Sequence, residues 1–596
     1  MLAGTTRKEG HVPTPTDPSP VARPSGGTRP RRRRRPQART DRDGARVTGP
    51  GRSGGRAVLE TLLAWGVRRV FTCPGSTEAA FLDATLDHLD FEVVLTPHES
   101  IAVSAADGYA RATGEPAVAY LHTHLGLANS LGHLNAARLA RSPVVVLTGL
   151  KPALIQAHRG FTSIQDTGRL AEPYVRSYWQ SLRTEELPED LNRAFRLALT
   201  EPSGPTWLGL SQDLMNDTCT APVADPGRFR PRARTAPDPE LIREVAGLLA
   251  TAAAPLLVAG AEVARHGAVA EIVALAERLG APVVNEDRRT YERPGFPTSH
   301  PNYAGLYDAK RSTVRDSDLI VFAGCRCFTE FEVPVRPDVP EGAHVVHIHS
   351  DATELGAIYG VDAGIVADER LALSALLDAL PEVGLAAEQD RVGRARAEHL
   401  ADTGPLPPET DGVENVAAVA DALAGLVGEN TTIVGDATTS GAILLRRLPQ
   451  DPPHQHYTTS SGSLGWAMGA ALGIKLALPE REVVAVVGDG AFQFGPQGLW
   501  VAARYQIPVT YVVINNESYA AVAAALRRYG GTAVERGDFP GKDLSGIDVS
   551  AIARGYGVFA QRIHSAAELG EAMAKARAHA GPALIEVMTD PDYLGP

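Results

Sequence analysis

Long apolar runs and cysteines are both scarce in this chain of 596 residues. No stretch approaches the roughly 18 consecutive apolar residues that a membrane-spanning helix needs, so we expect no membrane segment. The four cysteines, Cys73, Cys219, Cys325 and Cys327, are too few for a disulfide scaffold and fit a reducing cytoplasm. Cys325 and Cys327 form a CxC pair with no other cysteine nearby, so we interpret them as buried thiols rather than as zinc ligands.

Large apolar side chains are almost absent from residues 1–53, which are rich in Pro, Gly and Arg. We interpret this segment as a disordered basic tail, because it cannot bury a core. The tail carries 13 Lys and Arg against 4 Asp and Glu, a net charge of +9. Because the whole chain has a net charge of −12, the other 543 residues carry −21. Such an acidic body argues against nucleic acid as a partner. The tail also lacks the apolar core of a secretory signal, and we favour an extension that is dispensable for catalysis.

Short β-rich runs alternate with helical segments through the rest of the chain, which predicts an α/β fold of doubly wound parallel sheets. Residues 319–323 and 344–349, for example, have the composition of buried strands. We expect three such domains, at 54–225, 237–385 and 413–596, with a polar linker at 386–412. A chain of this length is several domains long, which agrees with that division.

The most informative stretch is 483–516. Residues 483–487 and 509–514 read as buried parallel strands joined by a helical crossover. The first strand ends in Gly488-Asp489-Gly490 and the second in Asn515-Asn516, so Asp489 and Asn516 are expected at one edge of a sheet. A carboxylate and a carboxamide oxygen suit Mg²⁺, which retains open positions for phosphates. The stretch therefore predicts a diphosphate site.

A GDG turn alone is a weak signal, but GDG, about 30 residues of βαβ and then NN resembles the cofactor signature of thiamine diphosphate enzymes. The resemblance implies that thiamine diphosphate is held through Mg²⁺ by Asp489, Asn516 and the backbone carbonyl of Ser518. It also implies that Gly488, Gly490 and Tyr519 contact the cofactor.

Two further segments of the last domain fit the interpretation of a thiamine diphosphate site. Thr438 and Thr439 follow an expected strand at the expected start of a helix, where hydroxyl and N–H groups suit an anion. Residues 461–465, SGSLG, precede another helix. The resemblance implies that the Gly462 carbonyl accepts the 4′-amino group of the cofactor, and that Leu464 is the apolar wedge that bends it.

In the first domain, Ser76, Glu99 and His122 all follow expected strands, at the sheet edge where α/β folds place their sites. By the family resemblance Glu99 is the activating carboxyl, bonded to the far nitrogen of the cofactor's pyrimidine. His122 and His124 are candidates for proton transfer near neutral pH.

The motifs Cys73-Pro74-Gly75-Ser76, His98-Glu99 and Leu121-His122 resemble those of the benzoylformate decarboxylase branch of the family. Ser76 and His122 match its substrate-contacting serine and its first catalytic histidine. The second catalytic histidine is missing: residues 324–330 read GCRCFTE, and an ungapped match lands on Glu330. Residues 519–526, YAAVAAAL, are also smaller than the branch's pocket residues.

Two activities therefore stay open. The leading one is non-oxidative decarboxylation of a 2-oxo acid to an aldehyde and CO₂. The alternative is an acetolactate synthase-type carboligase that makes an acyloin or a related 2-hydroxy-3-oxo acid. The resemblance implies a homodimer or homotetramer in which Glu99 of one subunit meets the diphosphate site of another, and we expect no FAD in the central domain. A non-catalytic scaffold is disfavoured, because a scaffold needs no activating carboxylate.

Overall fold

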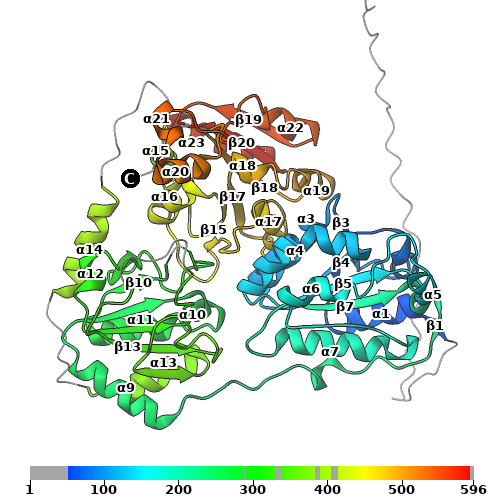
Figure 1. Ribbon diagram of the computed structural model, residues 1–596, viewed down its shortest axis with the longest axis horizontal. Helices are drawn as coiled ribbons and strands as arrows, with labels where there is room; N and C mark the ends of the chain where they lie inside the picture. Colours follow the sequence, from blue (N-terminus) through cyan, green and yellow to red (C-terminus); the bar gives the residue numbers. More distant parts are fainter. Residues whose placement is uncertain (1–50, 288, 330–337, 383–389, 405–413, 591–596) are drawn as a thin grey trace, which may run out of the picture. The chain divides into compact units, whose positions relative to one another are not determined.

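The computed structural model of the protein describes residues 51–596 apart from 288, 330–337, 383–389, 405–413 and 591–596. These residues form three six-stranded parallel sheets and one two-stranded antiparallel sheet (Figure 1). The α/β class expected from the sequence is confirmed. None of the described helices is long and apolar enough to cross a membrane.

The N-terminal sheet has the order β3-β2-β4-β5-β7-β6. Its strands are β2 (Arg69–Cys73), β3 (Glu92–Leu95), β4 (Ala117–His122), β5 (Val144–Leu150), β6 (Ser177–Gln180) and β7 (Thr206–Ser211). The chain leaves β2 for β3 and returns on the other side of β2 to form β4. The crevice where the strand order reverses therefore lies beyond the carboxyl ends of β2 and β4, next to Cys73 and His122.

Helices cover both faces of this sheet, as the continuous burial of Ala117–Leu121 in β4 requires. Val118 and Tyr120 belong to a core shared with α1 (Gly54–Ala64) and α7 (Leu187–Leu199). Ala119 and Leu121 point to the other face, which is packed by α3 (Glu99–Thr113) and α4 (Thr123–Leu139). The strand carries no charged side chain before His122 because both of its faces are buried there.

The central sheet has the order β11-β10-β9-β12-β13-β14, and its strand order reverses between β9 and β12. The strands are β9 (Pro255–Ala259), β10 (Val283–Asn285), β11 (Tyr303–Leu306), β12 (Leu319–Ala323), β13 (His344–His349) and β14 (Ala363–Val366). One face packs against α9 (Pro239–Thr251), α11 (Val269–Leu279) and α13 (Glu369–Ala379), and residues of α12 (Ser312–Arg315) and α14 (Arg391–Asp402) lie in the core of the other. The domain thus has two cores of its own.

The C-terminal sheet has the order β16-β15-β17-β18-β20-β19, the same winding as the N-terminal sheet. The strands are β15 (Thr431–Asp436), β16 (His456–Tyr457), β17 (Glu482–Gly488), β18 (Val509–Asn515), β19 (Phe559–Ile563) and β20 (Ala583–Met588). Residues of α17 (Trp466–Ala477) and α19 (Gln497–Tyr505) pack on one face, and those of α15 (Val416–Ala424), α16 (Thr439–Arg447) and α23 (Leu569–His579) on the other. The crevice at the reversal lies beyond β15 and β17.

Helices α3 and α17 cross at close range because glycines lie at the contact. A Cβ on Gly108 would stand 2.2 Å from the backbone oxygen of Ala470, and one on Gly473 would stand 1.9 Å from that of Ala105. Side chains from the N-terminal and C-terminal sheets consequently share one buried core.

The remaining helices are short connections, namely α2 (Ala79–Thr85), α5 (Ala153–Ala157), α6 (Gly168–Ala171), α8 (Gln212–Asn216), α10 (Ala261–Arg265), α18 (Asp489–Phe492), α20 (Ala520–Tyr529), α21 (Thr532–Arg536) and α22 (Val549–Gly555). Residues 1–50, most of the expected tail, lie outside the described residues. Arg52 and Ser53, which we expected in the tail, instead form β1 (Arg52–Ser53), which pairs with β8 (Thr218–Cys219). The Ser53 hydroxyl also accepts a hydrogen bond from Arg56 N, which caps α1.

Candidate active site

The crevice of the N-terminal sheet brings His122 against the loop that follows β2. A Cβ on Gly75 would lie 2.5 Å from the imidazole, so only glycine permits this approach. The sequence prediction that Ser76 and His122 share one sheet edge fits this geometry. Ser76 is exposed, and its hydroxyl accepts a hydrogen bond of 3.2 Å from Lys151 Nζ.

Glu78 is a buried carboxylate in this crevice, and no sequence motif singled it out. One oxygen accepts a 2.6 Å hydrogen bond from the backbone N–H of Gly75, and the other accepts one of 2.6 Å from the Thr77 hydroxyl. His122 Nδ1 lies 3.1 Å from Glu78 Oε2 and 3.0 Å from Thr77 Oγ1. An ionised carboxylate only accepts, so Nδ1 carries the proton and Nε2 is left to exchange protons.

Glu99 begins α3, and Asn129 Nδ2 donates to its Oε2 over 3.1 Å. A Cβ on Gly126 would come within 2.9 Å of the Glu99 side chain, which again explains a glycine. Cys73 lies between the two carboxylates: burial, then the charges of Glu99 and Glu78, raise the pKa of its thiol to about 11. Cys73 is therefore a neutral thiol that can donate to Glu99.

His124 is not part of this array. It lies in the first turn of α4, and its Nδ1 is buried without a hydrogen-bond partner among the described residues. The backbone turns sharply before it, because Thr123 has a φ of 55°. Glu330, where an ungapped match places the missing second histidine, lies outside the described residues.

The crevice of the C-terminal sheet gathers Asp489, Asn516 and Ser518. Asp489 follows β17 and Asn516 follows β18, and these strands are paired in parallel. Ser518 N donates to both side chains, over 3.2 Å to Asp489 Oδ2 and 3.2 Å to Asn516 Oδ1. The neighbouring Asn515 points elsewhere and donates to the buried Glu586. Only the second asparagine of the pair is thus directed to the crevice.

Asp489 is a buried carboxylate that accepts hydrogen bonds from backbone N–H groups. It is 7% exposed, and burial raises the pKa of its carboxyl to about 6. The described residues contain no cluster of three or more His, Cys, Asp or Glu that could hold a metal. One carboxylate, one carboxamide and a backbone carbonyl nevertheless form a donor set of the kind Mg²⁺ accepts when phosphates supply the rest, so the residues fit the ion.

The other expected cofactor residues surround this crevice. Gly488 precedes α18, and a Cβ on Gly490 would stand 2.6 Å from the ring of Tyr519. Thr438 is the N-cap of α16, which begins at Thr439 as expected.

The segment with Gly462 and Leu464 joins β16 to α17. Gly462 has a φ of 68°, a conformation that favours glycine, and the partly buried Leu464 packs against the shared core. Asp436, at the end of β15, accepts a hydrogen bond from the backbone N–H of Ala467, which ties the first turn of α17 to the same crevice. Burial raises the pKa of the Asp436 carboxyl to about 7.

The sheets and their crevices correspond to a known three-domain arrangement. Residues 52–169 match the thiamine pyrophosphate enzyme N-terminal TPP binding domain, 242–376 its central domain, and 434–587 its C-terminal TPP binding domain. The chain belongs to the thiamine diphosphate-dependent enzymes.

Its relatives include both decarboxylases and carboligases. The chain is 31% identical over 538 residues to benzoylformate decarboxylase of Pseudomonas aeruginosa, covering 89% of this chain and 98% of that protein. It is 29% identical over 562 residues to a probable acetolactate synthase large subunit of Methanocaldococcus jannaschii, covering 90% and 92%.

Solved structures of decarboxylases are also similar to this chain. A thiamine diphosphate-dependent 4-hydroxybenzoylformate decarboxylase of Rhodococcus jostii superposes with a TM-score of 0.79 at 28% identity, covering 90% of this chain and 99% of that one. Benzoylformate decarboxylase of Polynucleobacter necessarius gives 0.80 at 26% identity, covering 91% and 100%.

Proposed function

We propose that the chain is a thiamine diphosphate- and Mg²⁺-dependent decarboxylase that converts a 2-oxo acid to an aldehyde and CO₂. The observation that carries this proposal is His122, whose Nδ1 is bonded to the buried carboxylate of Glu78 beside an exposed serine. This pairing leaves Nε2 as a proton-transfer group on a side chain that is 24% exposed. The identity to benzoylformate decarboxylase supports the same reaction class.

The cofactor supplies, when bound, a thiazolium ring that takes up the electron pair left as CO₂ departs. Asp489, the Asn516 side chain and the Ser518 carbonyl would hold Mg²⁺, and Thr438, Thr439, Gly488, Gly490 and Tyr519 would surround the diphosphate. Gly462 and Leu464 would orient the pyrimidine end.

The N-terminal residues act on protons and substrate. Glu99, held by Asn129, would share a proton with the pyrimidine nitrogen. Ser76 would donate to the substrate, and His122 Nε2 would deliver the proton that completes the aldehyde. The Glu78 carboxylate stabilises the imidazolium whenever His122 holds a second proton.

We also propose that the sites form between subunits of a homodimer or homotetramer, with Glu99 of one subunit serving the C-terminal crevice of another. The central domain is proposed to bind no FAD. An absorbance spectrum of the purified protein tests it, since bound flavin would absorb in the visible.

The deciding experiment measures CO₂ release from aliphatic and aromatic 2-oxo acids with thiamine diphosphate and Mg²⁺, and identifies the organic product. Free aldehyde as the main product supports the proposal. The Glu99→Gln variant should bind the cofactor yet lose about 100-fold or more of the activity, the range of general acid–base effects. Undiminished activity in that variant would exclude this chemistry.

Carboligation is the second candidate, favoured by small side chains. Ala520, Ala521 and Ala523 line the start of α20, directly after Tyr519. Small side chains there would leave more room for a second carbonyl compound than bulky ones, and a probable acetolactate synthase large subunit is among the relatives. A ketol product, or CO₂ release that requires an added acceptor, would assign this activity instead.

A further inference from the structure

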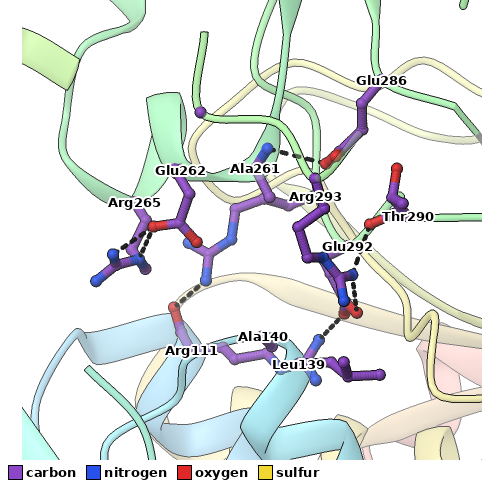
Figure 2. Close-up of a pocket in the computed structure, with 12 residues that line it drawn as sticks. Arg111, Leu139, Ala140, Ala261, Glu262, Arg265, Glu286, Thr290, Glu292 and Arg293 are labelled. Carbon is purple, nitrogen blue, oxygen red and sulfur yellow. Dashed lines mark hydrogen bonds and ion pairs between the residues drawn. The ribbon is translucent and has the colours of Figure 1, made fainter. Parts of the chain in front are cut away.

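Glu292 lies where residues of all three α/β domains meet, and it is 3% exposed. Its Oε2 accepts a 2.7 Å hydrogen bond from Arg111 Nη1 of α3. Its Oε1 accepts from Arg326 Nη2 of the central domain over 3.4 Å. The same oxygen accepts from Ser460 of the C-terminal domain, over 3.0 Å from N and 2.5 Å from Oγ. Figure 2 shows the Arg111 side chain reaching Glu292.

Arg111 extends this network to both ends of the segment 458–466. Its Nη1 donates over 2.7 Å to the carbonyl of Thr458, which begins the segment. Its guanidinium lies 4.5 Å from the ring centre of Trp466, which ends it. Asp107 completes the arrangement: it pairs with Arg111 over 2.8 Å and accepts a 2.7 Å hydrogen bond from Trp466 Nε1.

The central domain also holds the segment through its backbone and through Arg326. The carbonyl of Glu292 accepts a 2.9 Å hydrogen bond from Thr458 N. Arg326 Nη2 donates to Ser460 Oγ over 2.6 Å. A buried carboxylate that is hydrogen-bonded to two guanidinium groups and one amide has few alternative arrangements. Losing a guanidinium partner would leave a buried charge without a partner, which costs free energy because water cannot replace it.

We propose that Glu292 is a positioning residue for the cofactor: it fixes the segment 458–466, and through it the Gly462 carbonyl and the Leu464 side chain. This inference rests on the proposed function, in which these two residues orient the pyrimidine end of thiamine diphosphate. It gives the central domain, which supplies none of the proposed catalytic residues, a role in cofactor binding.

The test compares Glu292→Gln and Ser460→Ala with wild type. Glu292→Gln keeps the shape of the side chain but removes the charge that attracts Arg111 and Arg326. Ser460→Ala removes one hydroxyl and leaves the ion pairs intact, so it reports on the segment even if the first variant folds poorly. Glu115→Gln is the matched control, because Glu115 forms an exposed ion pair with Arg230.

Two readouts are independent of turnover. Amide hydrogen exchange of residues 458–466 in the cofactor-free protein should accelerate at least tenfold in Glu292→Gln. The dissociation constant of thiamine diphosphate, followed by tryptophan fluorescence, should rise about tenfold in Glu292→Gln and about threefold in Ser460→Ala, the scale of single hydrogen bonds with and without charge. KM for the cofactor should rise with it, while kcat at saturating cofactor changes less.

The outcomes separate the inference from the proposed function. If wild type binds no thiamine diphosphate, the proposed function fails, whatever the exchange rates show. If wild type binds it, and both variants match Glu115→Gln in exchange and in affinity, the positioning role of Glu292 is overturned.

Discussion

The Oε2 atom of Glu78 lies 3.1 Å from Nδ1 of His122, and the carboxylate is fully buried. The imidazole, in contrast, is 24% exposed at its side chain. The pair therefore has one partner enclosed by protein and one that reaches the crevice, which is the arrangement a proton-transfer histidine requires.

Replacing Glu78 by Gln should lower kcat by about 10- to 100-fold, since the amide no longer selects the Nδ1–H form or stabilises the imidazolium. Cofactor affinity should stay unchanged, because Glu78 lies in the substrate crevice. The measurements are kcat against pH and the dissociation constant of thiamine diphosphate. Glu277→Gln, which alters the exposed pair of Glu277 with His300, is the matched control. An unchanged pH profile in Glu78→Gln would remove His122 from proton transfer.

Replacing Gly75 by Ala should displace His122, because the new methyl would lie 2.5 Å from its ring. Overpacking of this kind costs about 1–3 kcal/mol of stability, and we expect turnover to fall at least as far as in Glu78→Gln. Gly247→Ala in α9 serves as the control. No atom lies within 4 Å of that Cβ, so the free energy of unfolding should rise by up to about 1 kcal/mol. Full activity in Gly75→Ala would show that the position of the imidazole is not critical.

Replacing Asp489 by Asn should stabilise the metal-free protein near neutral pH. The pKa of this carboxyl is about 6 in the folded chain, above its usual value of 3.8, so its ionisation opposes folding. The penalty grows as the pH rises from about 4 to about 6 and amounts to about 3 kcal/mol at most. Chemical unfolding in a chelator at pH 4 and pH 7 measures it, with the exposed Asp87→Asn as control.

Added Mg²⁺ should raise the free energy of unfolding of wild type but not that of Asp489→Asn. Because the ion requires the ionised carboxylate, its affinity should increase between pH 5 and pH 7, and Asp489→Asn should lose most of that affinity. Equal Mg²⁺ affinity in the two proteins would exclude Asp489 as a ligand.

Deleting residues 1–50 should leave catalysis and stability unchanged, whereas deleting 1–53 should reduce stability. The longer deletion removes β1, the Ser53 cap of α1 and the ion pair of Arg52 with Glu60. Loss of the cap alone costs about 1 kcal/mol. Thermal unfolding of the two truncated proteins, with turnover assayed in parallel, distinguishes them. Equal stability would show that β1 contributes nothing.

The sequence predicted the buried parallel strands best, because such strands are continuous apolar runs. The bounds expected for β12 and β13 agree with the structure, and those for β17 and β18 differ by one residue at an end or two. Strand β20 was missed, since Glu586 interrupts its apolar run. That carboxylate is buried among Asn515, Ser550 and Arg562, which are distant in sequence. Contacts between residues so far apart in the sequence cannot be predicted from a local sequence pattern.

The ends of these strands were predictable because the apolar runs stop there. The placement of four residues at the sheet edges was therefore also predictable, namely Asp489, Asn516, Ser76 and His122. Glu78 lies at the end of a short 3₁₀ turn, and residue spacing alone does not show that it faces His122. Its contact with His122 exists because β2 and β4 are neighbours although β3 lies between them in the chain. Pairings of that kind, like the Glu292 network, depend on topology that residue spacing does not encode.

The crossing of α3 and α17 makes the two ends of the chain a single cooperative unit. Their shared core joins side chains that are more than 350 residues apart, such as Ile101 and Met468, whereas the central domain keeps two cores to itself. Neither the N-terminal nor the C-terminal domain can be cut away without exposing that common core to water. The central domain, by contrast, has two hydrophobic cores of its own, so it can unfold locally while the N-terminal and C-terminal domains stay packed together.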